Sequence, residues 1–377
     1  MFDFPLMPED ATKASWVFCA FLYFSFMFFY RKQFTSAVNL GGSHYEFKNK
    51  RLFYILSFIF VICPFYAGDF AHYQTLVWEY DGQEIYHLEK IYRYLIPYIN
   101  NNYLLFRLIV WGGGYWVMFK AFKMYDVKQD FTFYFLFCIF ISSFSYARAG
   151  VAFSVYCLAV SILFADEKMK SAYRYLLGFS LLFLAYSLHK SMIVLILIVP
   201  ISYLKIQRKT IPLILIGILG IYFFSSGLLA LAETQLMDSE DLSTSAELYM
   251  QNAGSASASG GLQLLFFLWG KLIVHLPFLT MVYYVFSNNN EKMLPTNIKH
   301  IFRICFSVYV FSIFMFISFG SASALYYRYE GLLYIPMTVV LCYLRQIGKI
   351  PSKVFLTVFW ISSSYMMQLF LYRLIFR

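Results

Sequence analysis

The fold is decided by residues 140–200, which read FISSFSYARAGVAFSVYCLAVSILFADEKMKSAYRYLLGFSLLFLAYSLHKSMIVLILIVP. This stretch is almost wholly apolar, but polar residues interrupt it at 145–150, around Arg148, and at 189–191, which holds His189 and Lys190. The apolar runs beside these interruptions are each long enough to cross much of a bilayer, which takes about 20 helical residues. The stretch therefore predicts membrane-spanning helices with ionisable residues at their ends.

The composition of the whole chain agrees with this interpretation. Of the 377 residues, 60% are hydrophobic and 13% are charged, whereas a soluble domain is about half apolar and about a quarter charged. We therefore expect an all-α polytopic membrane protein and not a soluble enzyme. Aromatic residues make up 22% of the chain, a surplus that suits lipid-facing helices, interfacial belts and sugar-stacking surfaces alike.

Apolar runs predict about twelve transmembrane helices in a single domain over residues 1–377. They lie near 14–30, 52–67, 103–122, 131–147, 150–165, 173–188, 191–204, 211–231, 262–286, 300–319, 329–345 and 354–372. The formal charge is +10. Most of the 30 Lys and Arg residues fall in alternate loops if the N-terminus lies outside, as the positive-inside rule expects. The basic residues therefore indicate topology, and no nucleic acid partner is expected.

This orientation places five ionisable residues from separate parts of the chain on the outer side. They are Asp69, Glu89, Arg148, His189 and Arg328. Ionisable residues at membrane depth are costly and are often functional, and an outward-facing active site would require such a convergence. A second explanation stays open for Arg148, because arginine at a helix end can simply snorkel to the lipid headgroups.

Two outer loops are long, at about 68–102 and 232–261. The first repeats apolar and aromatic residues at helical spacing, which predicts short amphipathic helices that lie on the outer face. The second runs into residues 253–261, which are only Ala, Gly and Ser. That composition is typical of a flexible linker, and a mobile lid over a cleft is the alternative.

The motifs predict no cofactor and no metal. The chain has no nucleotide-binding signature, no CxxC and no HExxH. The nearest approach to a metal cluster is Asp238, Glu240 and Asp241 in the second outer loop. Clustered carboxylates can hold Mg²⁺ or Ca²⁺, although a solvated acidic loop is the more common meaning of such a run.

The outer arginines and the histidine suggest phosphate binding and proton transfer. The planar guanidinium of Arg grips phosphate oxygens in pairs, so Arg148 and Arg328 could hold a diphosphate and stabilise the charge that develops as it leaves. His189 could accept a proton from an attacking hydroxyl, because histidine is suited to proton transfer near neutral pH. Asp69 or Glu89 could orient that histidine, hold an acceptor sugar, or act as the base instead.

Several short motifs in order resemble the EpsG family of polysaccharide polymerases. They are Asp69 with Tyr73, Glu89 before an amphipathic run, residues 145–148, residues 189–191, and Tyr327 with Arg328. The resemblance spans roughly residues 50–340. The chain departs from the family pattern at Ala149, where the family usually has Gln after the arginine. For Tyr327, an interfacial aromatic belt is an equally good explanation.

The resemblance implies a glycosyltransferase-type polymerase that joins undecaprenyl diphosphate-linked oligosaccharide repeats outside the bacterial cytoplasmic membrane. It implies that His189, Asp69 and Glu89 are catalytic, and that Arg148, Arg328, Tyr73, Tyr327 and Lys190 bind substrate. The expected partners are the lipid-linked oligosaccharide, membrane lipids, a flippase and a chain-length regulator.

Three alternatives share part of these features. A flippase for the same lipid-linked sugars would use a cationic cavity, and Lys271 within an expected span favours it slightly. An O-antigen ligase shares the donor chemistry but uses a different acceptor. A membrane O-acyltransferase also uses an intramembrane histidine, but its thioester donor normally comes from the inner side.

Overall fold

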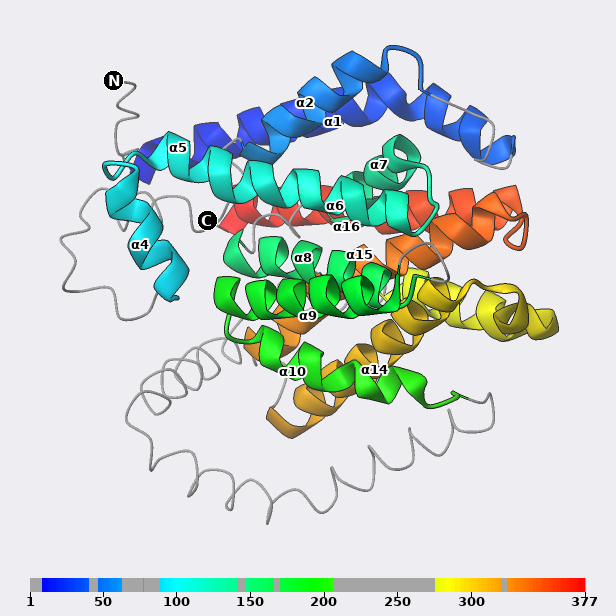
Figure 1. Ribbon diagram of the computed structural model, residues 1–377. Helices are drawn as coiled ribbons and strands as arrows, with labels where there is room; N and C mark the ends of the chain where they lie inside the picture. Colours follow the sequence, from blue (N-terminus) through cyan, green and yellow to red (C-terminus); the bar gives the residue numbers. More distant parts are fainter. Residues whose placement is uncertain are drawn as a thin grey trace.

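The computed structural model describes residues 9–40, 47–62, 77, 89–140, 147–165, 170–206, 275–319 and 324–376 (Figure 1). All regular structure in these residues is helical, which confirms the all-α class. Most of the long helices run along a common direction, and one short helix, α4 (Lys90–Tyr98), lies across one end of the bundle. The expected span at 211–231, and the second outer loop, lie outside the described residues.

Helix α8 (Ala147–Leu163) lies at the centre of the bundle. It contacts α6 (Gly113–Met124), α9 (Ser171–Leu188), α14 (Thr296–Phe319) and α15 (Ala324–Gln346). Its side chains from 149 to 157 are all buried. A helix that is apolar all round is expected to be buried all round, so the pattern of the deciding stretch accounts for this central position.

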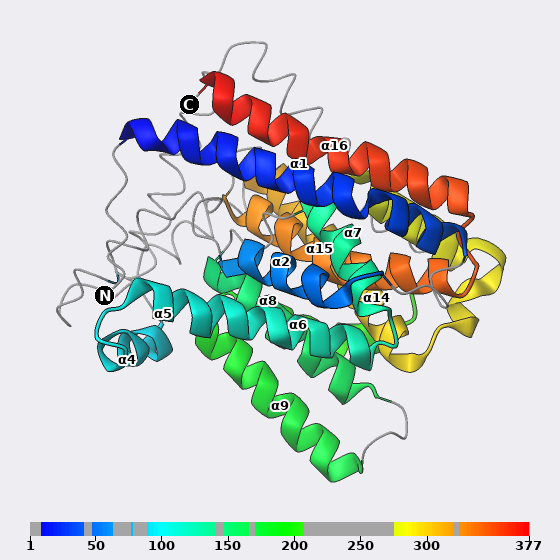
Figure 2. The same cartoon turned by 90° about the horizontal axis from the view of Figure 1, so that it is seen from above.

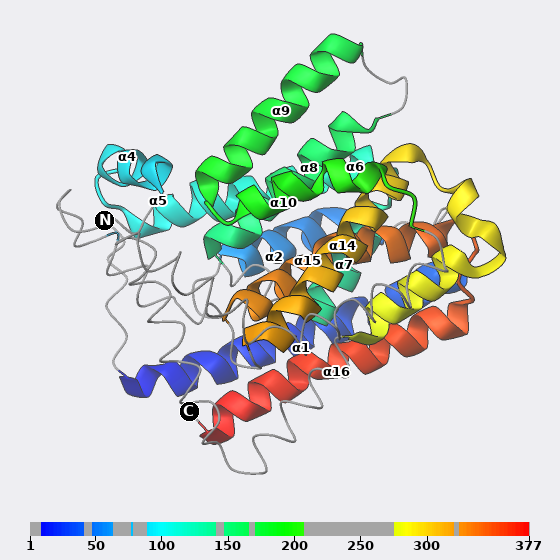
Figure 3. The ribbon, with the colours of Figure 1, turned by 90° about the horizontal axis from the view of Figure 1, so that it is seen from below.

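The helices near the two ends of the chain lie side by side along one flank (Figures 2 and 3). There α1 (Glu9–Asn39) packs against α16 (Ser352–Phe376) and α7 (Gln129–Phe140). The contacts are aromatic: the ring of Phe34 lies 4.4 Å from that of Phe359, and the ring of Phe26 lies 4.7 Å from that of Phe137. Much of the aromatic surplus is thus used inside the core, in offset and edge-on pairs that add to the burial of apolar surface.

Short elements connect the long helices. They are α2 (Lys50–Ile62), α5 (Tyr103–Arg107), a π-helical turn (Leu108–Gly112) that leads into α6, α10 (Met192–Ile198), and two 3₁₀ turns (Pro200–Tyr203 and Ser287–Met293). A further helix covers 275–286. Helix α4 has two faces, with Tyr92 and Ile96 buried and Tyr94 and Tyr98 exposed, at a place where the residue spacing predicts an amphipathic helix.

Within the part of the chain that the structure describes, no helix has both the length and the apolar character that a membrane crossing needs. The twelve expected spans therefore stay a prediction.

Two glycines bring α8 close to its neighbours. A Cβ atom on Gly114 of α6 would lie 2.9 Å from Val151 of α8, and one on Gly178 of α9 would collide with Leu163. Small residues let helices approach closely, and Gly114 is the last of three consecutive glycines at 112–114. Gly113 does not take part, since nothing lies within 4 Å of its Cβ position. The two contacts fix α6 and α9 on α8, and the ends of α8 and α9 carry the residues discussed next.

The end of the bundle away from α4 is held by side chains that bind backbone groups. The guanidinium of Arg345 is buried and donates to the carbonyls of Val38 and Ile350 and to the hydroxyl of Ser352. It thereby joins the end of α1 to the turn between α15 and α16. Arg303 similarly donates to the Ser202 carbonyl at 3.1 Å and to the Glu291 carboxylate at 2.9 Å.

Candidate active site

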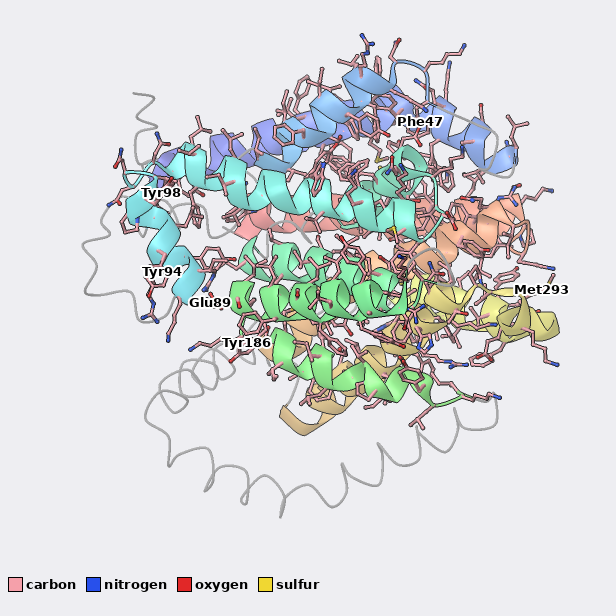
Figure 4. All side chains as sticks on the ribbon, viewed as in Figure 1. Phe47, Glu89, Tyr94, Tyr98, Tyr186 and Met293 are labelled. Atoms are coloured by element: carbon pink, nitrogen blue, oxygen red, sulfur yellow. The ribbon has the colours of Figure 1, made fainter. Side chains whose placement is uncertain are left out.

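Three helix ends meet at the end of the bundle where α4 lies. Glu89 directly precedes α4, Arg148 is the second residue of α8, and His189 directly follows α9. Figure 4 shows Glu89 at the end of α4 that is nearest to α9, and α4 contacts α9. The structure thus brings together three of the residues that the sequence singles out, from positions far apart in the chain.

Local backbone conformation turns two of these side chains toward one another. His189 is extended (φ −158°, ψ 117°) and ends α9, while its N–H still donates to the Ala185 carbonyl. Glu89 is also extended (φ −60°, ψ 146°), and its side chain makes no capping hydrogen bond to α4. The carboxylate is therefore available for contacts with other helices instead of the first turn of its own helix.

The Glu89 carboxylate is buried and is shared among three groups. Nη1 of Arg148 donates to Oε2. Nδ1 of His189 lies 3.2 Å from Oε1, within ion-pair distance but off the direction of an aligned hydrogen bond. The backbone N–H of Lys190 donates to the same oxygen at 3.4 Å. Catalytic hydrogen bonds are often loose in the free enzyme and tighten with substrate.

These contacts lower the pKa of Glu89. Burial by itself raises the pKa of a carboxyl, but the interaction with His189 and the positive charge of Arg148 outweigh it, and the pKa falls from 4.5 to about 2. Glu89 is thus ionised at neutral pH, and a carboxylate of such low pKa is a weak general base. An ionised carboxylate can only accept hydrogen bonds. It therefore favours the His189 tautomer with the proton on Nδ1 and a free lone pair on Nε2.

Exposure differs among the members of the site. The side chain of Glu89 keeps 7% of its surface, whereas Arg148 keeps 20% and His189 keeps 14%. Lys190 is exposed. Arg148, His189 and Lys190 therefore present more surface to the surroundings than the Glu89 carboxylate does.

One neighbour of the site was not singled out by the sequence. The ring of Tyr92, three residues after Glu89 and fully buried, lies 5.9 Å from the guanidinium carbon of Arg148. Its only sequence signal is its position on the apolar face of an amphipathic helix. Arg107 was also missed, because it falls inside an expected apolar span. It is buried, donates to the carbonyls of Val61 and Ile62 at the end of α2, and lies over the ring of Trp111.

The other expected site residues are placed only in part. Asp69 and Tyr73 lie outside the described residues. Tyr327 and Arg328 belong to the first turns of α15, but their side chains lie outside the described residues. Helix α15 begins at the end of the bundle where α4 lies (Figure 3).

No group of three His, Cys, Asp or Glu side chains that could hold a metal ion occurs among the described residues. The acidic run at Asp238, Glu240 and Asp241 lies outside them.

Comparison with known families assigns the chain. The model of the EpsG family matches residues 52–375. The chain belongs to the EpsG family. Its function is accordingly of the polysaccharide-polymerase type, in a family of membrane-associated proteins, and the EpsG match contains every residue of the site described above. Neither the curated proteins nor the solved structures contain a significant match.

Proposed function

We propose that this EpsG-family protein joins undecaprenyl diphosphate-linked oligosaccharide repeats into a polysaccharide on the outer side of the bacterial cytoplasmic membrane. The observation that carries the proposal is the approach of His189 Nδ1 to a buried, ionised Glu89. A histidine oriented by a carboxylate is a recurring arrangement for taking a proton from a hydroxyl.

In the proposed reaction, Nε2 of His189 takes the proton of an acceptor sugar hydroxyl. The oxygen of that hydroxyl attacks the anomeric carbon of the donor sugar, and a new glycosidic bond forms. The bond from that carbon to the diphosphate oxygen breaks, and undecaprenyl diphosphate leaves with the bonding electrons. A positioned base typically contributes 10²–10⁴-fold to the rate.

Glu89 supports this step and does not act as the base. It keeps the proton of neutral His189 on Nδ1 and stabilises the imidazolium that forms when Nε2 is protonated. Its low pKa makes it a weak competitor for the proton of the hydroxyl. Asp69 is the remaining rival base, and it would need burial to raise its pKa.

The diphosphate needs cationic partners. We propose Arg328, whose guanidinium suits phosphate oxygens, and Lys190, which is exposed beside His189. Arg148 stays a proposed diphosphate ligand as well, because a guanidinium carries five N–H donors and Nη1 is the atom that donates to Glu89. Tyr73 and Tyr327 are proposed to stack on sugar rings. A flippase and a chain-length regulator are the proposed protein partners.

Membrane placement is supported by exposed apolar side chains on the outer helices. On α9, Leu176, Phe179 and Phe183 share one face and keep 60–70% of their surface exposed. A large exposed apolar face is typical of lipid contact. Labelling of single cysteines, introduced after removal of the native ones, tests the orientation. Gly42 and Ser287 should be inside, and Gly82 and Ser257 outside. An inside position for Gly82 would overturn an outward site.

Replacement of His189 tests the proposal. The full chain is assayed in lipid vesicles with an undecaprenyl diphosphate-linked repeat as substrate. His189→Gln should insert normally and bind the lipid donor, but it should form no polymer. Polymer of normal length at a normal rate from His189→Gln would show that another residue is the base.

A deletion strain separates the proposal from its alternatives. Single repeat units should accumulate on the outer leaflet if the protein is a polymerase, whereas accumulation on the inner leaflet would indicate a flippase. Long chains that fail to reach their final acceptor would indicate a ligase.

A further inference from the structure

The first turn of α4 delivers two different groups to Arg148. The Glu89 carboxylate accepts a hydrogen bond from Nη1, and the Tyr92 ring lies 5.9 Å from the guanidinium carbon. Both groups come from one helix, and Arg148 comes from the central helix α8. The guanidinium of Arg148 therefore contacts two side chains that lie within one turn of each other in the sequence.

The Tyr92 ring is itself fixed. It is fully buried, and the ring of Phe106 from α5 packs edge-on against it, at 5.9 Å and 66°. An aromatic face attracts a guanidinium through its quadrupole, and more so where water is excluded. A fully buried ring that packs against Phe106 has little freedom to move away from Arg148.

The position of Arg148 in turn affects the catalytic pair. Arg148 engages Oε2 of Glu89, which leaves Oε1 for His189 and for the Lys190 N–H. A shift of the guanidinium would draw the carboxylate with it and change the distance from Oε1 to the imidazole. A misplacement of about 1 Å at a reacting group can cost about 10²-fold in rate.

We propose that Tyr92 is a positioning residue that acts through Arg148 and Glu89 on His189. The inference rests on the proposed function of His189 as the base. It also gives Arg148 a role within the protein, apart from any contact with the donor diphosphate. Tyr92 touches no substrate, so its loss should lower kcat and leave the KM for the donor unchanged.

The test compares Tyr92→Leu with Tyr92→Phe in the full chain, in vesicles, with the undecaprenyl diphosphate-linked repeat as donor. Tyr92→Leu removes the aromatic face, and kcat should fall about tenfold to a hundredfold, with the donor KM within about twofold of wild type. Tyr92→Phe keeps the face and should retain most of kcat. A rise in the donor KM at constant kcat would overturn the proposal, because it would place Tyr92 or Arg148 at the substrate.

Two controls separate positioning from general packing. Tyr94→Leu changes an exposed tyrosine of the same helix and should leave kcat unchanged. Phe106→Leu keeps the ring that faces Arg148 and removes only a ring packed against it, so it should lower kcat less than Tyr92→Leu does. If Phe106→Leu and Tyr92→Leu lower kcat equally, Tyr92 is only structural.

The double variant of Arg148→Lys with Glu89→Gln gives a second measurement. It tests the proposal even if Tyr92→Leu folds poorly. Residues that act through one another show non-additive effects, so Arg148→Lys should add little to the loss caused by Glu89→Gln. Full additivity would overturn the chain of action proposed here. An active His189→Gln would instead overturn the proposed function, whereas an inactive His189→Gln with a normal Tyr92→Leu would overturn this inference alone.

Discussion

Nδ1 of His189 lies 3.2 Å from Oε1 of Glu89, although the histidine directly follows α9 and the glutamate directly precedes α4. The approach gives the two residues different tasks. The carboxylate holds the imidazole, and the imidazole is left with one nitrogen that can take a proton.

Glu89→Gln should lower kcat by roughly 10–100-fold, the range found when a partner that orients a functional histidine is removed. The amide has no charge to stabilise the imidazolium, and it can donate as well as accept, so it no longer selects one tautomer. The rate of polymer formation in vesicles is the measurement. Glu291→Gln is the matched control, because Glu291 is also paired with an arginine, at the end of the bundle away from α4. Equal losses in the two variants would contradict a specific role for Glu89.

Acidification should remove the stability that Glu89 contributes. The pKa of this carboxyl is lowered in the folded state from 4.5 to about 2, so the ionised form stabilises the folded protein. The contribution is fully present above about pH 4.5 and is lost as the pH falls toward about 2. Melting temperatures of the wild type and Glu89→Gln should therefore converge over this range. A difference that stays constant from pH 6 to pH 3 would show that folding does not lower the pKa of Glu89.

Arg328→Lys should raise the KM for the donor, because it keeps the charge but loses the planar fork that matches a diphosphate. We expect an increase of about tenfold, equivalent to about 1.4 kcal/mol. Arg148→Lys should instead lower kcat, since its guanidinium binds Glu89. Initial rates over a range of donor concentrations separate the two effects. An unchanged donor KM in Arg328→Lys would reduce Arg328 to a membrane anchor.

Gly178→Leu should destabilise the protein, because a side chain at this position collides with Leu163 of α8. Overpacking of this kind costs about 1–3 kcal/mol. Gly113→Ala is the matched change at an open position, where nothing lies within 4 Å, and it should be neutral or stabilising by up to about 1 kcal/mol. Thermal unfolding of both variants checks the pair. An equal gain in stability in both variants would show that helix propensity, and not the contact with α8, decides the outcome.

The sequence identified Glu89, Arg148 and His189 as candidate residues beside apolar runs. It did not predict that Glu89 would contact both of the others. Arg148 was expected to act on a diphosphate because charge and helix-end position are all that one sequence provides, and that role stays a prediction. Its pairing with Glu89 depends on how α4 docks, and no periodicity in the sequence encodes that contact. The contact of Tyr92 with Arg148 could not be predicted for a related reason. The sequence spacing of a buried aromatic residue on an amphipathic helix is the same whether its neighbour is leucine or arginine.

The assignment of helices was more predictable. Runs at 150–165 and 173–188 match α8 and α9 closely, because continuous apolar character leaves few alternatives to a helix. The expected helix at 131–147 corresponds to α7 (Gln129–Phe140), and residues 141–146 lie outside the described residues. The expected helix at 103–122 contains a π-helical turn at Leu108–Gly112, where extra backbone is accommodated beside three glycines. Such local changes of winding follow from packing and are not visible in hydropathy.

The contact between α1 and α16 has a consequence for the order in which the protein is made. Helix α1 is synthesised well before α16, so Phe34 lacks its contact with Phe359 until α16 is made, whereas Phe26 can pack against Phe137 of α7 much earlier. The carbonyl of Val38 likewise cannot accept its hydrogen bond from Arg345 until α15 has been made. The part of α1 that packs on α16 must therefore be covered in another way until then, and a chain that stopped before α16 would leave Phe34 without its contact to Phe359.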